Sequence, residues 1–257
     1  MKHGIHDGIP EATYHADPAL SQSQAKTLLD CPARYRWELD HPREHKTVFD
    51  VGHAAHAKVL GVGAPVVVID ADSWRTKAAK DAADQARADG SVPLLRADAD
   101  AVDGMAEAVL AHPGARAIFE AEGASEQSVW WEDEGVQCRA RIDRLTAVAP
   151  IDLKTTQDAS PDGFGRSCAT FGYDLQDAAY TRAIEALTGE QQPLVFVAVE
   201  KAAPHFVGLY TLPDEARARG QRRWLDALDL YRRCTETGTW PAYGDDIRPV
   251  TWPRWAA

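Results

Sequence analysis

The sequence has few cysteines, and no two of them form a close pair. Only four occur among 257 residues, separated by 107, 30 and 66 positions: Cys31, Cys138, Cys168 and Cys234. Structural zinc and iron–sulfur sites usually draw ligands from at least one closely spaced cysteine pair. We therefore expect four reduced thiols and no iron–sulfur cluster, as is usual for a protein inside the cell.

Long apolar runs and a nucleotide-binding loop are missing as well. No stretch reaches the roughly 18 apolar residues that a membrane span requires, and the first fifteen residues, MKHGIHDGIPEATYH, lack the apolar core of a signal peptide. No G-x-x-x-x-G-K-[ST] loop occurs, so we expect no use of ATP. These absences predict a cytoplasmic protein without a membrane partner.

An excess of basic charge is also lacking. The chain has 28 Lys and Arg against 39 Asp and Glu, a formal net charge of −11, whereas nucleic-acid-binding proteins usually present a basic surface. The acidity is local, because residues 70–135 have 15 acidic and 6 basic side chains, while residues 136–170 have 4 and 5. The net charge therefore does not exclude a nucleic-acid partner at another part of the surface.

The residue patterns predict an α/β fold with a central mixed β-sheet flanked by helices. Alternating or β-branched runs predict strands at 66–70, 125–132, 136–148, 151–156, 194–200 and 205–211, and the three between 125 and 156 are expected to form an antiparallel meander. In the strand 136–148, one face is expected to hold Val136, Cys138, Ala140 and Ile142. Helical spacing and capping residues predict helices at 21–29, 32–39, 49–61, 72–88, 98–111, 172–189 and 214–234. In the helix 172–189, Leu175, Ala179 and Ala183 lie at near-helical spacing and are expected to share a buried face. The run His112-Pro113-Gly114 is expected to end the helical stretch before it.

Three ionisable residues of the predicted strands stand out. Asp152 and Lys154 are two positions apart on one strand, so their side chains leave the same face. Asp143 ends the preceding strand, and the short connection returns the chain beside it. Two carboxylates can hold Mg²⁺ for phosphodiester cleavage, while an ammonium orients water or offsets charge on the phosphate. The alternative is a surface strand with a simple ion pair.

Further motifs occur in order around these three residues. CPARYRWEL and GHAAHAKVLG precede RARID and DLKTT, and YDLQDAAY follows them. Over about residues 10–210 this order resembles the PD-(D/E)xK nuclease superfamily, in particular the RecB-like and exodeoxyribonuclease VIII (RecE)-type phage recombination exonucleases. Ile142 stands where these nucleases usually have proline. The resemblance implies a restriction-endonuclease-like core with an N-terminal helical region.

The resemblance also implies roles for individual residues. It makes His56, Asp143 and Asp152 metal ligands and Lys154 the catalytic lysine, so these four residues form the expected catalytic set. His53 is an alternative ligand, because His53 and His56 are three positions apart and share a helix face. The spacing alone does not choose between the two histidines.

A second group of residues is expected to bind DNA or to support the catalytic set. The resemblance places Gln176 and Tyr180 beside the active site, and the alternatives are solvent for Gln176 and helix–sheet packing for Tyr180. Glu126 is either an additional carboxylate of the site or an exposed strand residue. Arginines of this segment either contact phosphates or pair with acids; they are Arg139, Arg141, Arg144 and Arg166.

The resemblance implies one nuclease domain over residues 1–257. Its expected parts are an N-terminal helical part of the site (1–69), an acidic helical insertion or cover (70–124), a catalytic core (125–237) and a C-terminal tail (238–257).

The implied activity is that of a Mg²⁺-dependent exodeoxyribonuclease, with Mn²⁺ able to substitute. It would degrade one strand of linear double-stranded DNA, 5′ to 3′, and leave 3′ single strands for a RecT-like annealing protein in a bacterial host cell. A homo-oligomeric ring is implied too. The alternatives are an endonuclease or single-strand nuclease with the same site, or a non-cutting DNA-binding recombination partner.

Overall fold

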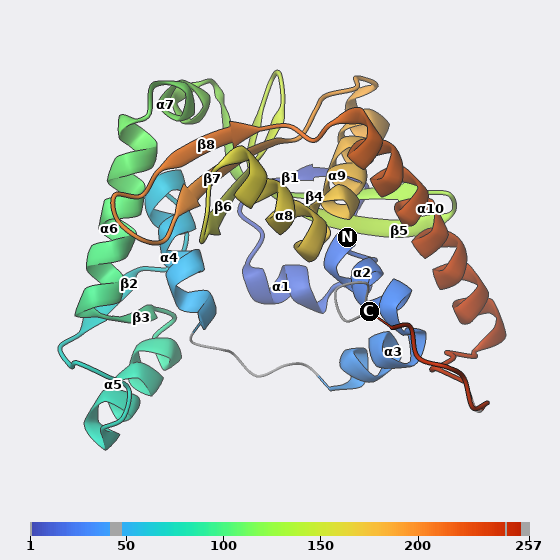
Figure 1. Cartoon of the computed structure of the whole chain (residues 1–257), viewed down its shortest axis with the longest axis horizontal. Helices are drawn as coiled ribbons and strands as arrows, with labels where there is room; N and C mark the ends of the chain where they lie inside the picture. Colours follow the sequence, from blue (N-terminus) through green and yellow to red (C-terminus); the bar gives the residue numbers. More distant parts are fainter. Residues whose placement is uncertain (1, 42–47, 245, 253–257) are drawn as a thin grey trace.

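The computed structural model describes residues 2–41, 48–244 and 246–252. They form a mixed six-stranded sheet with helices on both faces, and a separate two-stranded sheet (Figure 1). The large sheet has the order β1-β4-β5-β6-β7-β8, in which β6 and β7 run parallel and the other neighbours antiparallel. The predicted α/β class with a central mixed sheet is confirmed.

The chain begins with a short strand and its last described element is a long helix. The strands are β1 (Gly4–His6), β2 (Val66–Ile69), β3 (Val92–Leu95), β4 (Gly123–Asp133), β5 (Val136–Thr146), β6 (Pro150–Thr156), β7 (Val195–Glu200) and β8 (Val207–Tyr210). The helices are α1 (Glu11–Ala16), α2 (Gln22–Asp30), α3 (Pro32–Asp40), α4 (Val48–Leu60), α5 (Lys77–Ala88), α6 (Arg96–Ala111), α7 (Pro113–Glu120), α8 (Pro161–Phe171), α9 (Tyr173–Thr188) and α10 (Asp214–Thr237). Within the ranges described, no helix is long and apolar enough to cross a membrane.

The strands β4 and β5 form the predicted antiparallel hairpin. Their turn lies at Glu134 and Gly135, whose φ angles of 48° and 78° are typical of a tight two-residue hairpin turn. The residues predicted to share one face of β5 are all buried in a single core cluster: Val136, Cys138, Ala140 and Ile142. The alternation of apolar and polar residues therefore sets which face of this hairpin is inside.

The two larger apolar cores of the described residues lie on opposite faces of the sheet. One lies between the sheet and α2, α9 and α10, and the other between the sheet and α4, α6 and α7 (Figure 1). Helix α9 packs tightly into the first core, and Leu175, Ala179 and Ala183 are fully buried at the predicted helical spacing. The sheet and α9 are therefore a rigid base for any side chains that project from them.

Several short elements differ from the sequence-based prediction. The prediction did not include β1, α1, β3, α7 or α8. The run at 112–114 was expected to end a helix and to start none, but α7 begins there. His112 accepts a hydrogen bond from the Ala115 backbone N–H through Nδ1, and Pro113 occupies the first helical position, so both residues begin the new helix.

Candidate active site

The candidate site lies where β5 and β6 separate. The two strands pair only at Arg144 with Ile151 and at Leu145 with Pro150, although each continues for several residues beyond this contact. The Asp143 carboxylate spans the opening, because its Oδ2 accepts a hydrogen bond of 2.7 Å from the Leu153 backbone N–H. A side chain thus replaces the backbone pairing at the point where the sheet opens.

Asp152 is the most enclosed residue of the expected catalytic set. It is 2% exposed, and its Oδ1 accepts a hydrogen bond of 2.5 Å from Gln176 Nε2 of α9. Its Oδ2 lies 2.5 Å from Lys154 Nζ, on the same face of β6 as predicted. Burial raises the pKa of Asp152; the Lys154 charge opposes this and the nearby Asp143 charge adds to it. Gln176, itself 3% exposed, contacts this carboxylate rather than solvent.

His56 lies on helix α4 and contacts the Asp143 carboxylate. Its Nε2 lies 3.0 Å from Asp143 Oδ2, and its Nδ1 lies 2.8 Å from the Gly52 carbonyl oxygen. Burial disfavours the charged ring, but the Asp143 charge and hydrogen bond outweigh it and raise the pKa of His56 to about 9. Asp143 changes in the opposite direction: burial raises its pKa, but His56 outweighs this and lowers it. The charge of His53, the alternative ligand, instead acts on Glu11 of α1, where it adds to the effect of the His15 hydrogen bond in lowering the pKa of Glu11.

An aromatic ring completes the surroundings of Lys154. Its ammonium lies 4.7 Å from the ring centroid of Tyr173, at the start of α9, within the range of a cation–π interaction. The Tyr173 ring is stacked on Phe196 at 5.7 Å, so it is held by the sheet. Burial lowers the pKa of Lys154, but the charges of Asp152 and Asp143 outweigh it and raise the pKa, so the ammonium stays protonated. Tyr173 was not among the predicted site residues, although it begins the YDLQDAAY motif.

The hydroxyl of Tyr180 bonds to the backbone of β5 rather than to a catalytic side chain in the gap between β5 and β6. Its hydroxyl donates a hydrogen bond of 2.7 Å to the Arg141 carbonyl oxygen, two residues before Asp143, and the side chain is 6% exposed. The two candidate residues on α9 therefore act differently: Gln176 contacts an acidic side chain of the site, and Tyr180 fixes the strand that carries the other. Helix–sheet packing was the alternative proposed for Tyr180, and its contact is of that kind.

The arginines of the hairpin are used inside the fold. Arg141 donates hydrogen bonds to Ser128 Oγ at 3.0 Å and to the Ile9 carbonyl at 2.7 Å. Arg139 is only 2% exposed, and both guanidinium groups stack on the Tyr14 ring of α1. Arg144 donates to the Ser125 hydroxyl and to the Ala121 carbonyl. Arg166 lies outside the hairpin, on α8, and its exposed side chain pairs with Asp158 at 3.3 Å.

Glu126 lies across the hairpin from Asp143. The pairs Ser125–Arg144 and Gln127–Ile142 enclose both residues, which places them opposite each other in the register. Glu126 has a φ of 53°, a left-handed conformation that is unfavourable for a residue with a side chain and that often marks functional sites. Burial raises the pKa of Glu126, and the Asp143 charge adds to this effect. The residue is therefore a third carboxylate near the gap.

The donor atoms at this gap suit a hard divalent cation. Carboxylate oxygens are the ligands that Mg²⁺ and Mn²⁺ prefer, and the charge of Asp143 disfavours the ionised form of buried Asp152, a repulsion that a bound cation would relieve. Among the described residues, no three His, Cys, Asp or Glu side chains are gathered as a preformed metal cluster. His56 and Lys154 neutralise the two carboxylates instead. His56, Asp143 and Asp152 are the residues that would hold the metal.

Comparisons with known proteins agree with this architecture. A search of curated proteins gives no match. A crystal structure from Eubacterium rectale, described as a "Putative exonuclease", has a TM-score of 0.65 and 14% identity over 96% of this chain and 97% of that chain, a similarity that shows the fold. The structure of SSO0001, at a TM-score of 0.30 and 13% identity over 81% of this chain and 85% of that chain, is too dissimilar to support a conclusion.

The family assignment rests on a match over most of the sequence. Residues 21–250 match the model of a family described as a PDDEXK-like domain of unknown function (DUF3799). This range contains His56, Asp143, Asp152 and Lys154. Together with the similarity in fold, the match supports a nuclease of the PD-(D/E)xK superfamily. The chain belongs to this PDDEXK-like family.

Proposed function

We propose that the protein is a Mg²⁺-dependent nuclease that hydrolyses phosphodiester bonds of DNA at the gap between β5 and β6. The observation that carries the proposal is the meeting of Asp143 from β5 with Asp152 and Lys154 from β6 where the strands separate. Membership of the PDDEXK-like family supports it. A simple surface ion pair accounts poorly for an Asp152 that is 2% exposed and also bonded to Gln176.

The roles of the residues follow from their contacts. When bound by His56, Asp143 and Asp152, Mg²⁺ would supply Lewis acidity toward a phosphoryl oxygen and lower the pKa of a water molecule. The Lys154 ammonium, held by Asp152 and the Tyr173 ring, offsets negative charge that develops on the phosphate. Gln176 orients the Asp152 carboxylate, and the Tyr180 hydroxyl fixes the backbone of β5 beside Asp143.

The proposed substrate is the end of linear double-stranded DNA. In this proposal the enzyme degrades one strand 5′ to 3′ and leaves a 3′ single strand for a RecT-like annealing protein, with Mn²⁺ able to replace Mg²⁺ and with a homo-oligomeric ring holding the duplex. The RecE-like order of motifs supports the proposal, and so does the similarity in fold to a structure described as a "Putative exonuclease".

Digestion of end-labelled DNA tests this proposal. A linear duplex labelled at the 5′ end of either strand should release the label early and as short products in Mg²⁺, whereas a label at the 3′ end should persist on long fragments. A covalently closed circle should stay intact. Cleavage of the circle would indicate an endonuclease, and metal-dependent binding without any cleavage would indicate a DNA-binding recombination partner.

A further inference from the structure

Helix α9 presents two faces with different chemistry. Tyr173, Gln176 and Tyr180 lie at helical spacing on one face: the first two contact side chains of the active site, and Tyr180 contacts the backbone of β5. Asp174 and Asp177 lie on a second face, and both form ion pairs with arginines of α10. Helix α9 therefore contacts both the active site and the long helix α10, which runs beside it in the ribbon (Figure 1).

Two buried carboxylates hold three arginines of α10 in place. Asp174 and Asp177 are 3% and 1% exposed, and buried carboxylates require compensating charge. Arg223 Nη1 donates to Asp174 at 2.7 Å, Arg219 Nε lies 3.6 Å from Asp174, and Arg217 Nε lies 3.7 Å from Asp177. The helices approach closely because α10 has a glycine at the crossing: a Cβ on Gly220 would lie 2.0 Å from the Asp174 carbonyl oxygen.

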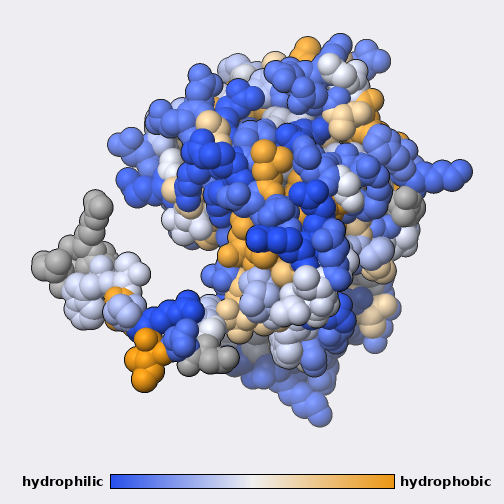
Figure 2. Space-filling model, turned by 90° about the vertical axis from the view of Figure 1, so that its right-hand side faces the viewer, coloured by the Kyte–Doolittle hydropathy of each residue, from blue (hydrophilic) through white to orange (hydrophobic). Residues whose placement is uncertain are grey.

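The arginines provide more hydrogen-bonding capacity than the two carboxylates use. Each guanidinium has five N–H donors in a fixed fork, and the ion pairs engage only part of each fork. Their side chains remain 40%, 54% and 27% exposed for Arg217, Arg219 and Arg223, respectively. Figure 2 views the molecule from the α10 side, and hydrophilic residues cover most of this face. The three cations are thus paired with α9 on one side, Arg223 through a hydrogen bond and the other two through longer ion pairs, while parts of their side chains reach solvent.

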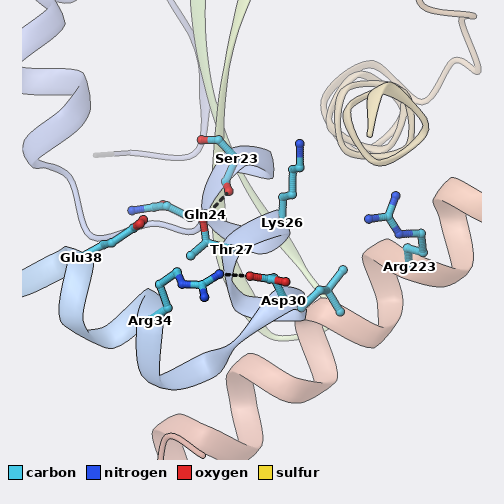
Figure 3. A pocket seen from close by; sticks show the side chains of 9 residues that line it. Ser23, Gln24, Lys26, Thr27, Asp30, Arg34, Glu38 and Arg223 are labelled. Carbon is cyan, nitrogen blue, oxygen red and sulfur yellow. Dashed lines mark hydrogen bonds and ion pairs between the residues drawn. The ribbon is translucent and has the colours of Figure 1, made fainter. Parts of the chain in front are cut away.

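Helix α2 adds a further cation at the end of this row. Lys26 and Arg223 both line a pocket of about 830 Å³ beside α2, α3 and α10 (Figure 3). A Cβ on Gly172 would lie 3.7 Å from both Arg223 Nη1 and Lys26 Cδ, so the two cations flank that residue. The Lys26 ammonium donates to the Phe171 carbonyl at 2.8 Å, which holds it near the start of α9.

The same pocket has an acidic side, but that side is partly neutralised. Asp30 and Glu38 line it, and Arg34 pairs with Asp30. The cationic side adjoins Gly172, and the next residue along the chain is Tyr173, whose ring contacts the Lys154 ammonium. The basic row therefore leads from α10 and α2 to the wall of the catalytic gap.

We infer that Lys26, Arg217, Arg219 and Arg223 form a phosphate-binding track that holds the sugar–phosphate backbone of the DNA substrate beside the catalytic gap. The inference rests on the proposed nuclease function. Guanidinium groups oriented by buried carboxylates suit phosphate oxygens, and such backbone contacts position DNA without reading its sequence. The track also explains how a chain with a net charge of −11 holds an anionic substrate.

Binding measured without cleavage tests the track. The full-length protein is titrated, in EDTA, into a short fluorescent DNA duplex at salt concentrations from about 50 to 200 mM. The double variant Lys26→Gln, Arg219→Gln should bind about 10- to 100-fold more weakly. The slope of log affinity against log salt concentration should fall by the amount that corresponds to about two phosphate contacts. The matched control is Arg232→Gln, Arg233→Gln on the same helix, where both arginines pair with half-exposed Asp229. This control should keep the wild-type affinity.

The single variant Lys26→Gln keeps the test decisive if the double variant fails to fold, as judged by circular dichroism. Lys26 compensates no buried carboxylate, and its loss alone should weaken binding about three- to tenfold. Unchanged affinity of a folded track variant, an equal loss in the control, or no duplex binding by the wild type would each overturn the inference. Track-dependent binding by a protein that cuts no DNA with Mg²⁺ would leave the track standing and refute the proposed nuclease activity.

Discussion

The acidic helices α5 to α7 and the α9–α10 pair place the same residue types in opposite environments. Asp84, Asp103 and Glu120 on α5, α6 and α7 are 77%, 54% and 61% exposed and pair with cations at the surface. Asp174 and Asp177 on α9 are almost fully buried. Exposed pairs contribute little to stability because water and salt screen them, whereas a buried carboxylate affects both folding and its neighbours' orientation.

The difference shows why the net charge describes this protein poorly. Most of the excess acid lies at residues 70–135, where exposed carboxylates pair with cations at the surface, as Asp84 does with Arg87 and Glu120 with Arg116. The acids of the catalytic gap and of α9 are instead matched by basic groups or proposed as metal ligands. The number of acidic residues therefore matters less than which of them are removed from water.

The largest expected effect is on catalysis. Lys154→Ala or Asp152→Asn should lower the rate of DNA cleavage by about 10³-fold or more, because each removes a charge that contacts the reacting groups in the proposed mechanism. The matched control is Asp103→Asn, which removes an exposed carboxylate paired with Lys58. Rates come from gel-resolved digestion of linear duplex. Equal losses in the control and the site variants would contradict the assignment.

The second effect is a pH-dependent difference in folding stability at Asp177. Burial, opposed by Arg217 and reinforced by Asp174, raises the pKa of Asp177 to about 6. A pKa above the unfolded value favours folding at low pH, and this contribution is lost as the pH rises from about 4 through 6. Asp177→Asn does not titrate, so its stability relative to wild type should increase by up to about 3 kcal/mol between pH 4 and 7.

Urea unfolding of both proteins across this pH range measures that difference. If the free energies of unfolding of the two proteins change with pH in parallel, burial does not raise the pKa of Asp177. Glu120→Gln is the matched exposed variant, since its partner Arg116 is equally exposed, and its stability relative to wild type should change little over the same range.

The third effect is a packing effect at the crossing of α9 and α10. Gly220→Ala places a methyl group against the Asp174 carbonyl and should lower the free energy of unfolding by about 2 kcal/mol. Gly165→Ala in α8 is the control, because a Cβ there meets no atom within 4 Å; alanine should be neutral or stabilise the helix by about 0.5–1 kcal/mol. A loss of stability that is the same in both variants would show that the helices are not in close contact at Gly220.

The smallest effect is expected from the surface ion pairs. Removing the Arg116–Glu120 pair on α7 should change the free energy of unfolding by less than about 0.5 kcal/mol, and added salt should reduce the difference further. Thermal unfolding at low and high salt measures it. A cost of several kcal/mol would mean that exposed and buried acids do not differ as described.

Local patterns in the sequence were sufficient for much of the fold. The alternation in β5 and the helical spacing in α9 predicted their buried faces, because burial follows the period of each element. The parallel pairing of β2 with β3 was not predicted, since a strand that pairs across an intervening helix leaves no short-range signal. The start of α7 was missed because its N-cap is a histidine rather than Ser, Thr, Asp or Asn.

The candidate site was predicted in its residue types but not in its contacts. Asp143, Asp152 and Lys154 followed from strand spacing, and the family resemblance added His56, which lies against Asp143. The separation of β5 from β6, the Gln176–Asp152 hydrogen bond and the Tyr173 ring near Lys154 depend on how distant segments pack. An aromatic three residues before Gln176 in the YDLQDAAY motif was the available signal for the last of these.

Restoration of Mg²⁺ to EDTA-treated protein tests the central claim most directly. The wild-type protein is incubated with end-labelled linear duplex in EDTA, and Mg²⁺ is then added in excess. The account predicts no cleavage before the addition, release of label after it, and none at either stage for Asp143→Asn. Absence of cleavage with either Mg²⁺ or Mn²⁺, or equal cleavage in EDTA, would contradict a metal-dependent nuclease site at the gap between β5 and β6.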